Sequence, residues 1–355
     1  MESTIGVESA TFRTPDGVLL AYGSIAPVAR DMAYTISRGD SRMKFKFKLG
    51  EKRQPVPPEG SVVFLHGWGL DASSMLPWAL ALSELGYRGI MVDLRNHGRS
   101  SRAPAGFGAR ESRDIAALVE QLQVDGRLPP PVYLFGVSYG AATALFAEPL
   151  LRERIAGIVA MESYANAGDG VRGVIARMQA RRGDDGMRAS LMRAYARWRH
   201  DARDIERGIA EAGQRLELDL DAVDVRAALT TTATCTLLLH GADDQYIPVA
   251  AAHALAGASP LVRYRELADE NHISLPLRID WLALPIARWM QQAAGGDCEP
   301  LQLPPDPLAD GGPSQLVISG DLAPEADPDT GHPGADIAAP PPSTDATAHE
   351  HAIPR

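Results

Sequence analysis

Hydrophobic and polar positions alternate with a period of two in the first part of the chain, a pattern typical of half-buried β-strands. From Met43 to Leu49, phenylalanine and leucine fall on one face and three lysines on the other. A Thr-Pro-Asp-Gly turn at positions 14–17 separates two further strand-like runs, Ser9–Arg13 and Val18–Tyr22. Residues 1–60 are therefore predicted to form antiparallel strands.

The pattern changes after residue 60, where short continuous apolar runs alternate with stretches of helical spacing. The strand-like runs are Ser61–Leu65, Gly89–Val92, Val132–Phe135, Ile155–Met161, Cys235–Leu239 and Val262–Leu267. The helix-like stretches lie near residues 75–86, 109–124, 139–152, 249–257 and 279–293. Apolar strands between amphipathic helices are typical of a parallel sheet covered on both faces. Residues 61–164 and 231–298 are thus predicted to form the two halves of one α/β core.

Two stretches depart from this alternation. Residues 165–230 are rich in Arg, Ala, Asp and Met and have helical spacing around Val174–Met178, which predicts a helical insertion. Residues 299–355 contain twelve prolines together with many aspartates and alanines. That composition is typical of disorder, so we predict a disordered, acidic, proline-rich tail from residue 299 onward.

The negative charge of the chain is concentrated at its end. Residues 299–355 hold ten Asp or Glu and one Arg, which gives −9, so the other 298 residues carry −1 of the total of −10. Without a basic surplus, nothing indicates a nucleic-acid partner. The first residues lack a basic start followed by an apolar segment, and no run of about 18 apolar residues occurs. We therefore predict no secretion signal, no membrane span and a cytoplasmic location.

The two cysteines add little to this interpretation. Cys235 begins an apolar strand-like run and is interpreted as a small buried apolar residue, whereas Cys298 borders the predicted tail. We do not expect a disulfide between them.

The most informative motif is the pentapeptide Gly136-Val137-Ser138-Tyr139-Gly140, which lies between a strand-like run and a helix-like stretch. A serine between two glycines on a sharp strand-to-helix turn is typical of a nucleophile elbow. The backbone of Ser138 is then expected to be strained, so that its hydroxyl stands clear of the sheet. A side chain at position 136 or 140 would collide with the neighbouring strand or helix.

A nucleophilic serine needs a general base, and the base needs a carboxylate that orients it. Where such an elbow occurs, the acid and the histidine follow Ser138 in chain order. The fifth strand-like run opens into a loop with Asp243 and Asp244, and the sixth is followed by His272. Glu162 follows the fourth run in the same way. All these loops leave the carboxyl ends of strands, where open α/β sheets place their sites.

Four blocks of the chain together resemble the α/β-hydrolase superfamily, over roughly residues 10–293. They are Phe64-Leu65-His66-Gly67-Trp68-Gly69, then Asp93-Leu94-Arg95-Asn96-His97-Gly98-Arg99-Ser100, then the elbow, and finally the pair of loops with the acid and the histidine. The second block is similar to the D-x-R-G-H-G-x-S of the family. The resemblance implies the α/β-hydrolase fold, a mostly parallel, doubly wound sheet with antiparallel N-terminal strands from residues 1–60. It further implies a helical lid over 165–230 and a lysophospholipase- and carboxylesterase-like branch.

The resemblance also implies roles for individual residues. Ser138 corresponds to the nucleophile and His272 to the general base. In the G-x-x-D-x-x-x-P loop of the family the acid stands four residues before the proline, which corresponds to Asp244. Asp243 and Glu162 stay open as alternative acids.

Two backbone N–H groups would complete the implied site as an oxyanion hole. One belongs to Tyr139, directly after the nucleophile at a helix N-terminus, and the other to Trp68, after His66 and Gly67. In the family the histidines that match His66 and His97 order loops and do not transfer protons. The resemblance implies no cofactor and no metal.

The implied activity is hydrolysis of carboxylic esters or thioesters through an acyl-enzyme, with a small ester or lipid-like molecule as substrate. Two alternatives stay open: the same triad acting on another bond, such as an amide or a carbon–carbon bond or as a cofactor-free perhydrolase, and a non-catalytic binding protein on the same scaffold. Met178, Met187, Met192 and Trp198 are candidates for an apolar acyl-binding wall in the lid. Nothing in the sequence predicts the oligomeric state.

Overall fold

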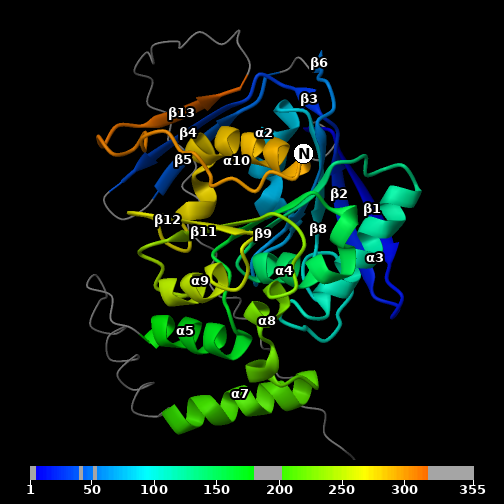
Figure 1. The fold of residues 1–355 in the computed structure, drawn as a ribbon, viewed down its shortest axis with the longest axis vertical. Helices are drawn as coiled ribbons and strands as arrows, with labels where there is room; N and C mark the ends of the chain where they lie inside the picture. The colour runs from blue at the N-terminus through cyan, green and yellow to red at the C-terminus, as the bar shows by residue number, and fades with distance from the viewer. Residues whose placement is uncertain (1–4, 40–42, 51–53, 180–201, 319–355) are drawn as a thin grey trace, which may run out of the picture. The chain divides into compact units, whose positions relative to one another are not determined.

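A twisted sheet of eight strands forms the centre of the molecule in the computed structural model, which describes residues 5–39, 43–50, 54–179 and 202–318 (Figure 1). The strands lie in the order β1-β2-β8-β7-β9-β10-β11-β12. Their bounds are β1 Val7–Arg13, β2 Leu19–Ile25, β7 Gly60–Leu65, β8 Tyr87–Val92, β9 Val132–Val137, β10 Gly157–Met161, β11 Thr236–Gly241 and β12 Val262–Leu267. β1 and β2 pair antiparallel, β2 joins β8 antiparallel, and the remaining pairs are parallel. The predicted fold class is confirmed.

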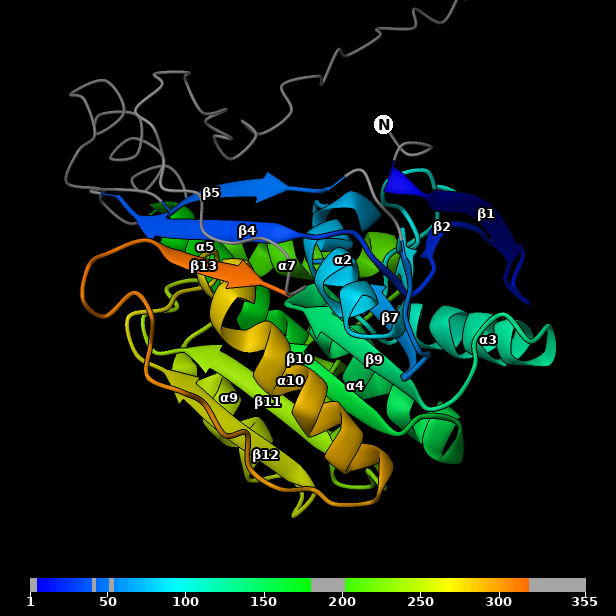
Figure 2. The same cartoon turned by 90° about the horizontal axis from the view of Figure 1, so that it is seen from above.

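Helices cover both faces of this sheet, as Figure 2 shows for α10 and α2 on one side and α3 and α4 on the other. The α-helices are α2 Leu76–Glu84, α3 Glu111–Val124, α4 Tyr139–Leu151, α5 Ala167–Gln179, α7 Ala202–Leu216, α8 Val225–Leu229, α9 Val249–Ala256 and α10 Ile279–Ala294. Short 3-10 helices are η1 Ala72–Met75, η2 Arg152–Arg154, η3 Leu220–Ala222 and η4 Leu275–Leu277.

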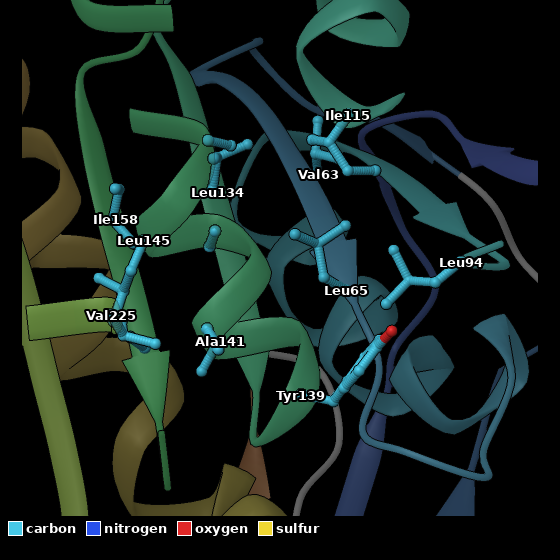
Figure 3. Packing of buried hydrophobic residues seen from close by; sticks show 14 of the residues in the cluster. Val63, Leu65, Leu94, Ile115, Leu134, Tyr139, Ala141, Leu145, Ile158 and Val225 are labelled. Carbon is cyan, nitrogen blue, oxygen red and sulfur yellow. The ribbon is translucent and has the colours of Figure 1, made fainter. Parts of the chain in front are cut away.

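Each face of the sheet has its own hydrophobic core. One core joins the strands to α3, α4, α8 and α9, and the other joins them to α2 and α10. Every residue of β7, β9 and β11 is buried, which explains why these strands are continuous apolar runs. Small residues bring α4 close to the sheet, where Ala141 and Leu145 pack near Leu65 and Leu134 (Figure 3). This close packing fixes the N-terminus of α4, where Ser138 lies.

The N-terminal strands divide among three sheets, which differs from the prediction that residues 1–60 belong to one. Only β1 and β2 join the main sheet. β4 Ala33–Arg38 and β5 Met43–Lys48 form a separate three-stranded sheet with β13 Ser314–Val317, and β3 Val28–Ala29 pairs with β6 Gln54–Pro55. The alternation along β5 is as predicted, with exposed lysines opposite half-buried apolar residues. Alternation predicts a strand and its buried face, but it carries no information about the partner strand.

The beginning of the predicted tail is ordered, and the prediction of disorder from residue 299 is wrong for residues 299–318. Leu301, Leu308 and Leu316 are buried in the core that contains α10, and β13 pairs with β4. The indole N–H groups of Trp289 and Trp281 donate to the backbone oxygens of Glu299 and Pro304. The average composition of residues 299–355 did not reveal these few buried leucines. Residues 319–355 lie outside the described part of the chain.

The expectation about the cysteines is also wrong, because Cys235 and Cys298 form a disulfide. Their Cα atoms lie 5.3 Å apart across a sequence separation of 63 residues. The chain leaves α10 and returns to the start of β11, a long-range contact that local sequence cannot reveal. Disulfides persist mainly in oxidising compartments, so this bond does not favour the predicted cytoplasmic location.

The predicted helical insertion contains α5, α7, η3 and α8 in its described residues. Arg172 of α5 holds the insertion together, since its guanidinium pairs with Glu206 of α7 at 2.7 Å and Asp221 of η3 at 2.6 Å. Three residues of the predicted acyl-binding wall, Met187, Met192 and Trp198, lie outside the described residues. In the described part of the chain, no helix combines the length and apolar character needed to cross a bilayer.

Candidate active site

Ser138 lies between β9 and α4 in a strained backbone conformation, with φ 53° and ψ −110°. A Cβ added to Gly136 would lie 2.3 Å from the backbone oxygen of Gly140, and one added to Gly140 would lie 2.1 Å from that of Leu65. Both contacts are far below van der Waals distance, so only glycine fits at either position. These are the collisions that the elbow motif predicts. The strained turn leaves the side chain of Ser138 partly exposed above the sheet.

The structure brings together three of the predicted site residues in one hydrogen-bonded chain. His272 lies in the loop after β12, and its Nε2 is 3.0 Å from the Oγ of Ser138. Its Nδ1 is 2.7 Å from Oδ2 of Asp244, in the loop after β11. The carboxylate of Asp244 is fully buried, and His272 is 14% exposed. An imidazole with one nitrogen toward a carboxylate and the other toward a hydroxyl can accept the proton of that hydroxyl.

The Asp244 carboxylate accepts further hydrogen bonds that fix its orientation. Its Oδ1 accepts the backbone N–H groups of Tyr246 at 2.7 Å and Ile247 at 2.9 Å. Burial acts to raise the pKa of Asp244, but its hydrogen bonds to His272 and Glu162 outweigh burial and lower it. The alternative acid Asp243 is exposed, and no described hydrogen bond joins it to His272. Of the two neighbouring aspartates, only Asp244 faces the histidine.

Glu162, the other alternative acid, lies behind Asp244 and does not contact His272. Its side chain is fully buried, and its Oε2 is 3.3 Å from Nδ1 of His240, a buried residue near the end of β11. Nε2 of His240 is in turn 3.4 Å from Oδ2 of Asp244. Burial, followed by the Asp244 carboxylate, raises the pKa of Glu162 to about 10. Glu162 therefore keeps its proton at neutral pH.

Donor atoms of Glu162, His240 and Asp244 lie within 4.8 Å of one another, which makes them the one group in the described chain close enough to hold a metal ion. The Asp244 oxygen that faces this group already accepts a hydrogen bond from His272. A protonated Glu162 beside a neutral imidazole accounts for the arrangement, so we assign no metal here.

The two predicted oxyanion donors belong to residues close to Ser138 in the chain or in space. Tyr139 is the first residue of α4, so its backbone N–H has no partner within the helix. Gly67, just before Trp68, approaches closely enough that an added Cβ would lie 3.8 Å from Cβ of Ser138. No hydrogen bond of the described residues uses the backbone N–H of Trp68 or Tyr139.

Aromatic rings surround this part of the site. The Trp68 ring stacks on Phe107 at 5.2 Å between centroids and meets Tyr139 edge-on at 5.1 Å. Trp68 is nevertheless 53% exposed. The helical insertion reaches the other side, where the guanidinium of Arg177 in α5 lies 5.7 Å from the Tyr246 ring, which itself packs on His272. Phe107 and Tyr246 were not among the predicted site residues, because their positions carry no motif.

The other motif residues order loops. His66 accepts the Leu94 N–H at Nε2 and contacts the Gly67 oxygen through Nδ1, while burial lowers its pKa to about 4. Asp93 accepts the backbone N–H groups of Ala72 and Arg99. Asn96 has a φ of 65°, the left-handed conformation that asparagine tolerates.

A second buried charge cluster supports the His272 loop, and the sequence analysis missed it. Glu270 is fully buried and pairs with Arg278, which is also fully buried, and with Arg38 of β4 at 2.7 Å. Arg278 also pairs with Asp306 in the C-terminal segment. The loop that carries His272 is thus tied to the second sheet and to residues 299–318. Ion pairs between residues so distant in sequence leave no local signal.

Comparisons with known proteins identify the family of this chain. A model described as "Alpha/beta hydrolase family" matches residues 62–352. The chain belongs to this family. Similar solved structures include an esterase from Pyrococcus furiosus (14% identity, 84% of this chain and 96% of that one, TM-score 0.56) and one from Exiguobacterium antarcticum (17%, 80% and 100%, 0.52). An enol-lactonase from Burkholderia xenovorans LB400 is also similar (20%, 79% and 99%, 0.51).

At these identities the similar structures support the α/β-hydrolase fold and not a substrate. No curated protein sequence matches the chain significantly. The activity must therefore be argued from the site.

Proposed function

We propose that this α/β hydrolase cleaves carboxylic esters through an acyl-enzyme formed on Ser138. The observation that carries the proposal is the chain from Ser138 through His272 to the buried Asp244, with distances of 3.0 and 2.7 Å. A serine beside an imidazole that a carboxylate orients is suited to nucleophilic attack on a carbonyl.

In the proposed reaction His272 Nε2 takes the proton of Ser138 as the hydroxyl oxygen attacks the ester carbonyl. The negative oxygen of the tetrahedral intermediate would accept hydrogen bonds from the N–H groups of Trp68 and Tyr139. Asp244 stabilises the imidazolium and stays ionised. His272 then gives its proton to the departing alcohol, which leaves the acyl group on Ser138. Water attacks the acyl-enzyme with the same base, and the acid is released.

Exposed apolar side chains beside the site favour an ester with an apolar part. Trp68, Leu70 and Ile273 are each more than 40% exposed, and they flank the oxyanion residues and His272 in sequence. An apolar substrate group would cover these side chains, which stabilises the bound state. A lysophospholipase- or carboxylesterase-like substrate fits this surface. Rates on p-nitrophenyl esters of increasing acyl length should therefore rise beyond acetyl, and a sharp preference for acetyl would oppose the apolar substrate.

The experiment that tests the proposal compares Ser138→Ala with the unmodified protein. An alkyl fluorophosphonate should label the protein once, at Ser138, and the variant should lose both labelling and ester turnover. Ser74→Ala is the matched control, because Ser74 is exposed and its hydroxyl bonds only to the backbone of Asp71. Ester turnover that persists in Ser138→Ala, or labelling at another serine, would contradict the proposed nucleophile.

A further inference from the structure

Behind the proposed catalytic acid, two side chains have no solvent contact and no part in the proposed reaction. Glu162 follows β10 and His240 lies within β11, and each side chain has 0% exposure. Glu162 also has a φ of 58°, a left-handed conformation that is strained for a residue other than glycine. Burying a carboxyl group in a strained backbone is unfavourable, so other interactions of Glu162 must compensate.

The hydrogen-bond donors and acceptors around Glu162 and His240 indicate which of their atoms carry hydrogens. Nε2 of His240 is 2.9 Å from the backbone oxygen of Ile247, which can only accept, so Nε2 carries the hydrogen. Burial lowers the pKa of His240, so its ring is neutral and Nδ1 has a lone pair.

The Glu162 carboxyl group faces that lone pair. Its Oε1 accepts the Gly241 N–H at 3.2 Å, and its Oε2 is 3.3 Å from Nδ1 of His240. A carboxylate oxygen against an imidazole lone pair would be repulsive, whereas a carboxylic acid O–H can donate to it. Both atoms are buried without a hydrogen-bond partner in the structure, so a proton on Oε2 would turn this 3.3 Å approach from a repulsion into an attraction.

We propose that protonated Glu162 and neutral His240 act as a positioning pair, which holds the Asp244 carboxylate in the orientation that His272 requires. The proposal rests on the proposed function. Glu162 orients the His240 ring, and the Nε2–H of that ring, donated mainly to Ile247, also faces Oδ2 of Asp244 at 3.4 Å. Oδ2 thus faces a second N–H group in addition to that of His272. In this proposal the row of polar contacts that begins at Ser138 extends through His240 to Glu162.

The pair gives the site a dependence on alkaline pH. Asp244 and His240 are the titratable groups beside Glu162, and Glu270 acts on it electrostatically. The charge of Glu162 in turn acts to raise the pKa of Tyr264. Glu266 and His272 act on His240. The two carboxyl groups nearest to Glu162, Asp244 and Glu270, both oppose its ionisation. Once Glu162 ionises, its charge repels both the His240 lone pair and Asp244, and the orientation of Asp244 is lost.

The test measures the rate constant for fluorophosphonate labelling of Ser138 from about pH 7 to about pH 11. In the unmodified protein the rate should fall as pH rises through about 10, the pKa of Glu162. Glu162→Gln mimics the neutral acid, so its rate should stay within roughly threefold at about pH 8 and the alkaline fall should be absent. Glu162→Ala should lose roughly tenfold to a hundredfold, less than the ~10⁴-fold reported for a disabled triad acid.

Glu148→Gln is the matched control, because Glu148 is also fully buried with one unbonded oxygen, but its side-chain partner is Thr234 and not a site residue. It should keep the alkaline fall. An alkaline fall that persists in Glu162→Gln would overturn the proposal, as would equal damage in the glutamine and alanine variants.

A second measurement does not depend on labelling or on a substrate. Infrared spectra at about pH 8 should contain the carbonyl stretch of a protonated carboxylic acid that disappears in Glu162→Gln. Its absence from the unmodified protein would overturn the proposal even if the esterase function holds. Conversely, failure of Ser138 to label at any pH, with the infrared band present, would oppose the proposed function and leave the protonated pair in place.

Discussion

Ser138 is held in place by packing, whereas Asp244 and His272 are held by buried polar and charged groups. On the serine side, Gly136 and Gly140 let β9 and α4 approach until no Cβ fits between them. On the other side, Glu162 and His240 lie behind the acid, and the Glu270 and Arg278 pair anchors the histidine loop. The site thus depends on steric packing around Ser138 and on electrostatic interactions around Asp244 and His272.

The two kinds of support predict different sensitivities. Steric contacts do not change with pH, so the elbow should tolerate a change of pH and fail with an added methyl group. Buried charges do depend on protonation and on complete pairing, so the acid–base side should tolerate neutral isosteres and fail when one partner is removed. Three of the four substitutions below test this difference, and the fourth, Cys298→Ser, tests the disulfide.

The largest effect is expected from Gly140→Ala. The new Cβ would lie 2.1 Å from the Leu65 oxygen, so α4 must move or the protein must unfold. We expect fluorophosphonate labelling to fall at least about a thousandfold at every pH, because the nucleophile and one oxyanion donor move together. Gly208→Ala is the control, since Gly208 lies in α7 with nothing within 4 Å of an added Cβ. Near-normal labelling by Gly140→Ala would show that packing does not hold the serine.

Arg278→Met should cost about 3–5 kcal/mol of unfolding free energy, because it leaves buried carboxylates without their partner. Glu270 and Asp306 both lose an ion pair in this variant. Urea denaturation measures the loss. Arg226→Met, at an exposed arginine whose nearest acidic oxygen is 3.9 Å away, should change the unfolding free energy by less than about 0.5 kcal/mol. If the two variants are equally stable, the buried ion pairs of Arg278 do not stabilise the folded protein.

Cys298→Ser should lower the unfolding free energy by about 2–4 kcal/mol, since the disulfide closes a long loop and restricts the unfolded chain. The bond joins the start of β11 to the segment after α10. Urea denaturation with and without a reducing agent checks this, and reduction should bring the unmodified protein to the stability of the variant. If reduction leaves the stability unchanged, the cysteines are not paired in solution.

The last effect is a pH-dependent shift in the melting temperature of Glu162→Gln. The pKa of Glu162 is raised in the folded protein to about 10, so the folded state keeps a proton that the unfolded chain releases. The stability of the unmodified protein therefore falls as pH rises from about 5 towards 10, and glutamine lacks this loss. Between about pH 6 and 9, melting scans should show the variant gaining several degrees relative to the unmodified protein. A difference that is constant with pH would mean that Glu162 is ionised.

Local sequence predicted the main sheet and the serine side well, since both depend on short-range patterns. Apolar runs mark β7 and β9, and the glycines of the elbow are the residues that the tight turn requires. The sequence also placed acidic residues after the correct strands. It could not distinguish a carboxyl group that faces His272 from one that lies behind Asp244, because that difference is a matter of side-chain direction.

The parts that sequence did not predict depend on contacts between distant residues. The disulfide spans 63 residues, and Arg38 pairs with Glu270 although 232 positions separate them. The pairing of β13 with β4 brings together segments near the beginning and at the end of the described chain. Composition and periodicity are local properties, and they cannot identify such partners.

The ordered segment 299–318 has a practical consequence for shortening this chain. A cut after Cys298, where the proline-rich composition begins, would delete a strand, three buried leucines and the Asp306 partner of Arg278. Loss of Asp306 would weaken the position of Arg278, which pairs with Glu270 in the loop that carries His272. A cut after residue 318 keeps all of these contacts. The choice between two truncation points 20 residues apart would thus decide whether the purified protein retains a supported active site.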